Sequence, residues 1–519
     1  NELFYLGSPF LGLISLIPLY IALSKTTSFK RAGFLVSLQI TTVHVLSSFW
    51  LGNFKDFAIF TLGGTTALYL VWGYFLGQLL YSPFYFFKRT LITQNHFFSI
   101  PCKVLYFAGV WTLIEWYKST GWLAYPWGTL VMSAYKWSYI TQIVSITGTW
   151  GISFLFAFFA GVAAEGIQNV GTKNTSYTNV LFCCVALFGC TLAFGIVEYH
   201  KEKTPIDYIE TVIVQQNLDS WDSGNDNEAI SVSLNLTDKA ISEANKTPNL
   251  VIWSESVLNY THPESATYYQ VYPKSRPLVS AINELQIPFI IGGPVTINQE
   301  KQWYSNAALF FDKNGVFSDF YGKIQLVPFA EAIPYQEEEW IQNLMNSLVG
   351  FSSGWVSGPY YNLFTIDSIN GNPIKISTPI CFEDAFPYVC RNLVKEGSQV
   401  FYNITNDSWS LTKSAEYQHF AIASYRTIEN RCTMVRSTNS GYSVVISPTG
   451  KILYDLPLFE RTSMQVPVPV YEKEVTIYSQ LGDWLPYTLL FLWSIYFVTV
   501  AWKTGHPKKI IPNFHCKPE

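Results

Sequence analysis

The stretch NVLFCCVALFGCTLAFGIV, residues 179–197, contains no charged residue and is followed at once by EYHKEKTPIDYIETVIVQQ, residues 198–216. A run of this length suffices for a helix that crosses the roughly 30 Å hydrocarbon core of a bilayer. The residues that follow restore charge and then form a short β-branched run, which is typical of a strand. Residue 198 is therefore predicted to separate a membrane-embedded part, residues 1–197, from an extramembrane domain.

Similar apolar runs recur through the first part of the chain and once more near its end. Because lipid offers no hydrogen-bond partners to backbone groups, each run after the first is predicted to be a helix. The first run is short and contains Pro9 and Pro18. The predicted spans are residues 9–24, 33–51, 57–80, 101–117, 146–164, 179–197 and 484–502.

Composition supports a membrane protein and argues against some other classes. Only 13% of the 519 residues are charged, whereas soluble domains average about 25%. The formal net charge is −4, and no basic stripe of the kind that a phosphate backbone needs is present, so nucleic acid is not expected as a partner. The cysteines outside the apolar runs form no C-x-x-C pair and have no zinc-type histidine spacing, so no metal site is indicated.

Lysine and arginine are divided unequally between the short connections on the two sides of the predicted spans. One set of alternate connections, with the tail, holds eleven of these residues, and the other holds three. The positive-inside rule places the first set in the cytoplasm. Residues 198–483 are then predicted to lie outside the cytoplasmic membrane, and residues 484–519 to form the last span and a cytoplasmic tail. Parity also places Asn1 outside, so a further helix is expected before this numbering begins.

Residues 198–483 are predicted to form an α/β domain. Short runs rich in β-branched or aromatic residues alternate there with helical patterns, and Gly, Asn and Pro separate them. This alternation favours layers of helix and sheet over an all-β fold. The expected helices lie near 227–244, 275–285, 384–396 and 415–430, and the expected strands are Thr211–Gln216, Leu250–Ser254, Phe289–Gly292, Ala307–Phe311, Ile374–Thr378, Val400–Ile404, Thr433–Ser437 and Ser443–Ile446.

Three strand ends of this domain carry a carboxylate, an amine and a thiol. They are Glu255 in IWSES, Lys323 in FYGKIQLVPFAEAIP and Cys381 in STPICFED. A thiol with an ordinary pKa of about 8.5 is mostly protonated near neutrality and needs a base or a cation to become nucleophilic. Glu255 can take the proton, and Lys323 can stabilise an oxyanion. Taken singly, Glu255 could be a solvated strand end, Lys323 a surface charge and Cys381 a buried thiol.

Together with their flanks, these residues resemble the Glu, Lys, Cys triad of the nitrilase superfamily, and the whole chain is similar to the apolipoprotein N-acyltransferase family. The resemblance implies an αββα sandwich outside the cytoplasmic (inner) membrane of a bacterium. It implies transfer of a fatty acyl chain from a phospholipid to the α-amino group of a diacylglyceryl-cysteine on apolipoproteins, without cofactor or metal. The motifs that carry it are TLIEWYKSTGWLAYPWG (112–128), GTWGISFLFAF (148–158), VQQNLDSWD (214–222), LVPFAEAIP (326–334), NDSWS (406–410) and RSTNSGYSVVISPTGKI (436–452).

The resemblance also implies supporting residues. Glu331 matches a second glutamate beside the Lys and the Cys, where it would orient both. Glu383 and Trp221 match positions near the site and are expected at its mouth, where they would guide the acceptor; the alternatives are a helix-start acid and a packing aromatic. The chain departs from the family at Phe382, where a Tyr is frequent. A hydroxyl role at that position is therefore not expected.

The connection 118–145 contains Trp122, Tyr125, Trp127 and Trp137. An interfacial aromatic belt is the favoured interpretation, and a lip over which acyl chains reach the thiol is the alternative. The acids Glu115 and Glu165 and the histidine His44, all within or near predicted spans, are expected to be interfacial or packed against another helix.

Two other functions compete with acyl transfer. A membrane-tethered carbon–nitrogen hydrolase would use the same triad but direct water against the thioester, although a hydrolase needs only one anchor. A transporter or receptor would leave the triad unexplained, and neither interrupted paired helices nor intramembrane charges are evident.

Overall fold

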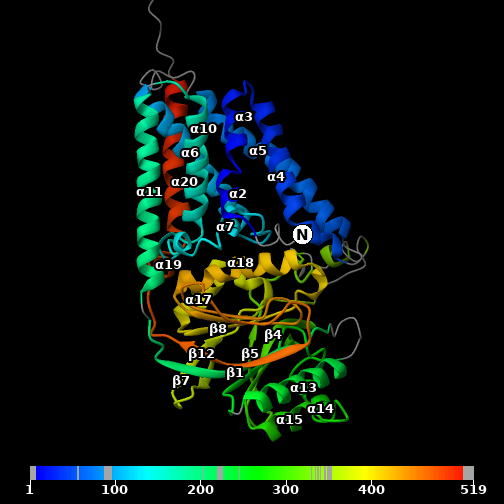
Figure 1. Ribbon diagram of the computed structural model, residues 1–519. Coiled ribbons are helices and arrows are strands. Elements are labelled where there is room, and N and C mark those ends of the chain that lie inside the picture. The colour runs from blue at the N-terminus through cyan, green and yellow to red at the C-terminus, as the bar shows by residue number, and fades with distance from the viewer. Residues whose placement is uncertain are drawn as a thin grey trace, which may run out of the picture.

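The computed structural model describes residues 7–505, apart from 55–57, 87–95, 173, 202, 219–225, 245, 329, 334, 336, 337, 339, 344–346 and 348–353. A bundle of long helices occupies one half of the molecule and an α/β domain the other, with short helices between them (Figure 1). The chain enters the α/β domain directly from the end of helix α11 and leaves it into helix α20. The boundary predicted at residue 198 therefore falls in the last turn of α11.

Six of the seven predicted spans coincide with long helices. These are α4 (Phe29–Ser47), α5 (Thr65–Phe86), α6 (His96–Lys118), α10 (Trp150–Gln168), α11 (Thr175–His200) and α20 (Trp484–Gly505). Among the described residues, α10 and α11 are long and apolar enough to cross a membrane, with mean hydropathies of 1.6 and 2.6. That the other helices span a bilayer stays a prediction.

The predicted span at residues 9–24 is helical but is interrupted at residues 15 and 16. The chain forms two shorter helices there, α2 (Pro9–Ile14) and α3 (Ile17–Lys25), with Pro18 in the first turn of α3. Proline has no N–H, so it cannot continue the hydrogen-bond ladder of a preceding helix, but it fits the first turn of a new one.

Two acids of the bundle, Glu115 and Glu165, are packed against neighbouring helices, as expected. Glu115 of α6 accepts hydrogen bonds from the indole of Trp111, the backbone N–H of Leu130 and the hydroxyl of Ser153. Glu165 of α10 pairs with Lys103 at 2.7 Å. Each buried carboxylate is thus supplied with donors, which is what its removal from water demands.

Two six-stranded sheets form the centre of the α/β domain. The first has the order β12-β1-β2-β3-β4-β5 and the second β11-β10-β9-β8-β7-β6. The strands are β1 (Asp207–Gln215), β2 (Leu250–Ile252), β3 (Phe289–Asn298), β4 (Trp303–Phe311), β5 (Phe317–Gly322), β6 (Phe364–Asp367), β7 (Pro373–Ser377), β8 (Val400–Thr405), β9 (Thr433–Thr438), β10 (Val444–Ile446), β11 (Ile452–Asp455) and β12 (Thr462–Val470).

Helices cover both outer faces of this pair of sheets, so the domain has the αββα layering implied by the resemblance. Helices α13 (Asn227–Ala244) and α15 (Leu278–Leu285) lie on the side away from the bundle, whereas α17 (Pro387–Glu396) and α18 (Lys413–Asn430) lie on the bundle side (Figure 1). Arg431, at the end of α18, is 3.0 Å from Glu198 of α11. The second sheet thus connects with the bundle through α18.

All eight expected strands and all four expected helices of this domain are present. Strands β5, β6, β11 and β12 were not predicted from the sequence. The clearest reason applies to β12, whose sequence TSMQVPVPV contains two prolines. Because β12 lies at the edge of its sheet and pairs only with β1, these prolines need not donate to a second neighbour.

Candidate active site

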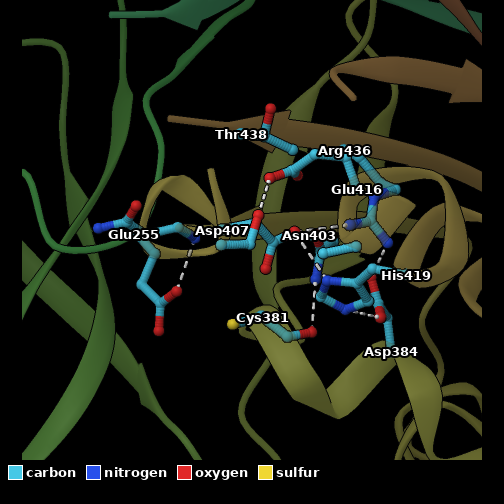
Figure 2. A network of polar contacts seen from close by, with 12 residues as sticks. Glu255, Cys381, Asp384, Asn403, Asp407, Glu416, His419, Arg436 and Thr438 are labelled. Atoms are coloured by element: carbon cyan, nitrogen blue, oxygen red, sulfur yellow. Dashed lines mark hydrogen bonds and ion pairs between the residues drawn. The ribbon is translucent and has the colours of Figure 1, made fainter. Parts of the chain in front are cut away.

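The three residues singled out from the sequence converge on one buried site. Glu255 follows β2, Lys323 directly follows β5, and Cys381 begins the short helix η4 (Cys381–Ala385) after β7. The Lys323 ammonium is 3.3 Å from a carboxylate oxygen of Glu255, and the two side chains are 1% and 6% exposed. The sulfur of Cys381 points toward the side where Glu255 lies (Figure 2).

Glu255 is held by two further donors. The Asn306 side-chain amide donates to one oxygen at 2.7 Å, and the backbone N–H of Asn406 donates to the other at 2.8 Å. Burial raises the pKa of Glu255, while Lys323 opposes that rise. A raised pKa brings a carboxylate closer to the range in which it can accept and return a proton near neutrality.

Gly292 of β3 allows the close approach of backbone on which the position of Glu255 depends. A Cβ atom on residue 292 would lie 2.5 Å from both the Cα of Glu255 and the carbonyl oxygen of Ser254. Any larger residue would displace the segment that carries the carboxylate. This glycine is therefore required by packing against the site.

Lys323 lies between two carboxylates. Glu331 is 2.8 Å from its ammonium, closer than Glu255, and Asn306 also donates to Glu331, at 3.0 Å. Burial alone would lower the pKa of Lys323, but Glu331 and Glu255 together raise it well above its usual value. The lysine is thus a permanent cation, as an oxyanion stabiliser must be. Glu331 lies beside Lys323, where the resemblance placed it.

Cys381 has a left-handed backbone conformation, with φ of 48°. For a residue with a side chain this conformation is unfavourable, and it persists where neighbouring contacts impose it. Burial and the charge of Glu255 raise the pKa of the thiol, whereas Lys323 lowers it. The resting group is therefore a thiol, and its activation requires proton transfer to a base.

The expectation that Glu383 lies at the mouth of the site is wrong. Its side chain is fully buried and accepts hydrogen bonds from the backbone N–H groups of Ile324, Gln325 and Ile380, at 2.7–3.0 Å. The hydroxyl of Tyr321 donates as well, at 3.1 Å. Glu383 thus joins the segment after Lys323 to the turn of Cys381. Trp221 lies outside the described residues.

Trp127 packs directly over the site. Its ring stacks on Phe382, with centroids 5.4 Å apart and planes 6° apart, and it is 5% exposed. The interpretation of the connection 118–145 as a belt is therefore wrong for this residue, whereas Trp122 is exposed. Phe382 offers the bundle a flat apolar surface where a Tyr would carry a hydroxyl.

The sequence did not identify several residues that complete the site. Asn306 bridges Glu255 and Glu331, and a buried network of Asp384, Asp407, His419 and Arg436 lies on the other side of Cys381 (Figure 2). Asp407 and Arg436 belong to the motifs NDSWS and RSTNSG, but the sequence of these motifs does not indicate which side chains the two residues contact. Among the residues that the structure describes, no group of three His, Cys, Asp or Glu side chains is arranged to hold a metal.

Residues 213–473, which include Glu255, Lys323 and Cys381, match the carbon-nitrogen hydrolase family, and residues 4–162 match the apolipoprotein N-acyltransferase N-terminal domain. The chain is 42% identical over 511 residues to apolipoprotein N-acyltransferase 2 of Treponema denticola, covering 96% of this chain and 93% of that protein. The chain belongs to the apolipoprotein N-acyltransferase family. Two other apolipoprotein N-acyltransferases to which it is similar come from Treponema pallidum (38% identical; 93% and 89% covered) and Borreliella burgdorferi (30%; 95% and 91%). Membership confirms the interpretation as an acyl-transfer enzyme and rules against the transporter or receptor.

Proposed function

We propose that this member of the family transfers a fatty acyl chain from a phospholipid to the α-amino group of a diacylglyceryl-cysteine at the N-terminus of an apolipoprotein. The acyl chain passes through a thioester on Cys381. The observation that carries this assignment is the convergence of a thiol, a carboxylate with raised pKa and a permanent ammonium in one buried site.

In the first half-reaction, the Cys381 sulfur attacks the ester carbonyl carbon of the phospholipid as Glu255 takes the thiol proton. The negative charge that develops on the carbonyl oxygen is stabilised by the Lys323 ammonium. Collapse of the tetrahedral intermediate breaks the ester C–O bond. Glu255 returns its proton to the departing oxygen, and the lysophospholipid leaves with the thioester in place.

In the second half-reaction, the amine of the acceptor attacks the thioester carbonyl carbon. Glu255 takes a proton from the attacking amine, and Lys323 again stabilises the oxyanion. The C–S bond then breaks, the amide remains on the acceptor, and the Cys381 sulfur recovers a proton from Glu255. One carboxylate therefore serves both halves of a ping-pong cycle, because each half begins with a proton to remove and ends with one to return.

Glu331 and Asn306 act as orienting groups in this scheme. Glu331 binds Lys323 through one oxygen and the backbone N–H of Val327, at 2.9 Å, through the other. Asn306 uses its amide to hold Glu255 and Glu331 together. The ammonium is thus held by a carboxylate that takes no part in proton transfer, which leaves Glu255 available to the thiol.

We further propose that the helical bundle is embedded in the cytoplasmic membrane, with the α/β domain on its outer, periplasmic side. The length and composition of α10 and α11 support this, as do large apolar side chains of α11 that are exposed, including Phe182, Val185 and Val197 at 73%, 63% and 66%. Such surface is unfavourable in water and favourable in lipid. The eleven-to-three division of Lys and Arg supports the orientation.

A membrane-tethered hydrolase would form the same thioester and pass the acyl group to water. The two functions are separated by incubating the purified protein with phospholipid and a diacylglyceryl-cysteine peptide, and measuring both the intact mass of the protein and the products. We expect an acyl increment that hydroxylamine removes, that Cys381→Ser lacks, and that disappears as N-acyl peptide forms. Release of free fatty acid in place of N-acyl peptide would identify a hydrolase, and the absence of any adduct would refute the thioester.

A further inference from the structure

A buried, charged network supports the turn that carries Cys381. Asp384, three residues after the nucleophile and fully buried, has one oxygen 2.9 Å from Nε2 of His419, and its other oxygen accepts from Arg436. Nδ1 of His419 is 2.8 Å from an oxygen of Asp407. His419 therefore lies between two carboxylates, one on each side of its ring (Figure 2).

This geometry favours an imidazolium at His419. A neutral imidazole has a single N–H, so one ring nitrogen would face a carboxylate oxygen as acceptor against acceptor. Burial lowers the pKa of His419, but Asp407 and Asp384 outweigh that effect and raise it to about 10. Both ring nitrogens therefore donate charge-assisted hydrogen bonds, which are stronger than those between neutral groups.

The charges of the network balance. His419 and Arg436 supply two cations, and Asp384 and Asp407 supply two anions. Burial and the charge of Asp407 raise the pKa of the remaining acid, Glu416, well above its usual value, which favours its neutral form. Removal of one member would leave an uncompensated charge away from water, which is strongly unfavourable.

The network joins the turn that carries Cys381 to the loop that binds the carboxylate of Glu255, and the separation of these two segments matters for proton transfer. Asp384 lies within η4, which begins at Cys381. Asp407 directly follows Asn406, whose backbone N–H holds the carboxylate of Glu255. The ring of His419, on α18, thus links the strained turn that carries Cys381 to the loop that holds the carboxylate of Glu255 in place.

The helical bundle closes over this link. The Trp127 ring lies 5.7 Å from the ring of His419 and stacks on Phe382, the residue after the nucleophile. The network is therefore shielded from water on that side, and electrostatic interactions within it are stronger than they would be in solvent.

We propose that His419 is a positioning residue for acyl transfer, whose cationic ring crosslinks Asp384 and Asp407 and thereby sets the Cys381 turn against the carboxylate of Glu255. The inference rests on the proposed function, since it concerns the geometry of that same site. It assigns His419 no contact with either substrate. Its effect is on the distance and direction of proton transfer, where a misplacement of about 1 Å can cost on the order of a hundredfold in rate.

The test compares His419→Gln with His262→Gln. His262 is also buried, but it stacks on Tyr269, which belongs to a hydrophobic cluster separate from the one that contains Phe382 and Ala385. Burial lowers the pKa of His262 to about 4. Both variants remove a buried ring, so a general loss of packing affects both. Two rates are measured at Cys381: acyl-adduct formation from phospholipid, by intact mass, and alkylation by iodoacetamide as a function of pH, by peptide mapping.

We expect His419→Gln to slow acylation by about tenfold to a hundredfold, with an unchanged KM for phospholipid and near-parental acylation in His262→Gln. The alkylation profile of Cys381 should also move to higher pH, because Asp407, which raises the pKa of the thiol, loses its neutralising cation. A folded His419→Gln protein that acylates within about twofold of the parent would overturn the inference.

Two further outcomes are an unfolded His419→Gln variant and a parent protein without an adduct. If His419→Gln does not fold, the isosteric Asp384→Asn replaces it, and we expect it to be about tenfold slower in acylation; a parental rate there would equally overturn the inference. If the parent protein itself forms no hydroxylamine-labile adduct on Cys381, the proposed function fails, which is distinct from the failure of His419 as a positioning residue.

Discussion

The Lys323 ammonium lies 2.8 Å from a carboxylate oxygen of Glu331, and the lysine side chain is 1% exposed. This pairing explains how a cation is kept in a buried site without neutralising the proton acceptor. Burial raises the pKa of the farther carboxylate, Glu255, and Lys323, 3.3 Å away, only partly opposes that rise. The division of roles between the two glutamates follows from these distances.

Replacement of the proposed nucleophile should abolish turnover without unfolding the protein. We expect Cys381→Ser to fold but to form no acyl adduct, because a carboxylate base generates an alkoxide far less readily than a thiolate. Intact mass after incubation with phospholipid measures this. Cys390→Ala is the matched control, since Cys390 is buried in α17 and outside the proposed mechanism. An equal loss in both variants would mean that the thiol is misassigned.

Replacement of the proposed base should block the first half-reaction itself. Glu255→Gln retains shape but cannot accept the thiol proton, so thioester formation is expected to fall by about 10²-fold to 10⁴-fold. Adduct formation is followed by mass over time. Glu331→Gln should be less impaired, because the base remains. Accumulation of adduct at the parental rate in Glu255→Gln would show that another group removes the proton.

The substitution Glu383→Gln tests whether this buried carboxylate holds the site together. Its two oxygens accept from three backbone N–H groups, and an amide must place its own N–H₂ against at least one of these donors. A mispaired buried donor costs about 1–3 kcal/mol, so both half-reactions and the melting temperature should decline together. Glu243→Gln, on an exposed side chain, is the control. If Glu383→Gln forms the acyl adduct normally but transfers it poorly to the amine, Glu383 guides the acceptor after all.

The charge on His419 predicts how stability depends on pH. Its pKa is raised from 6.5 to about 10 in the folded protein, so its contribution to stability is complete below about pH 6.5 and is lost as the pH rises toward 10. Melting temperatures measured from pH 7 to 10 should fall more steeply for the parent than for His419→Gln, which has no proton to lose. Parallel curves would indicate that the ring is neutral throughout.

The orientation of the chain can be measured independently of catalysis. Reporter fusions in the connection between α10 and α11, residues 169–174, and within the α/β domain are expected to report opposite sides of the membrane, with the former in the cytoplasm. The physical basis is the division of Lys and Arg among the short connections. Reporters that agree with each other would overturn the topology.

The sequence by itself determined the order of the elements and the chemical groups available to the site. Strands such as β8, predicted over Val400–Ile404 and observed over Val400–Thr405, could be predicted because β-branched and aromatic runs bounded by turn residues have few alternatives. Glu255, Lys323 and Cys381 could be selected because their flanks match a known triad. Such patterns are local, so one sequence is enough to detect them.

Only the tertiary structure decided which of these groups are buried, which are paired and which are charged. Glu383 was expected at the mouth of the site and is instead enclosed by backbone donors, and His419 carried no sequence signal at all. Glu255 and Lys323 are 68 residues apart in the chain, and His419 is 35 residues from Asp384. Protonation and hydrogen bonding depend on such neighbours in space, because burial and nearby charges set the pKa of a group, and neither can be read from adjacent residues.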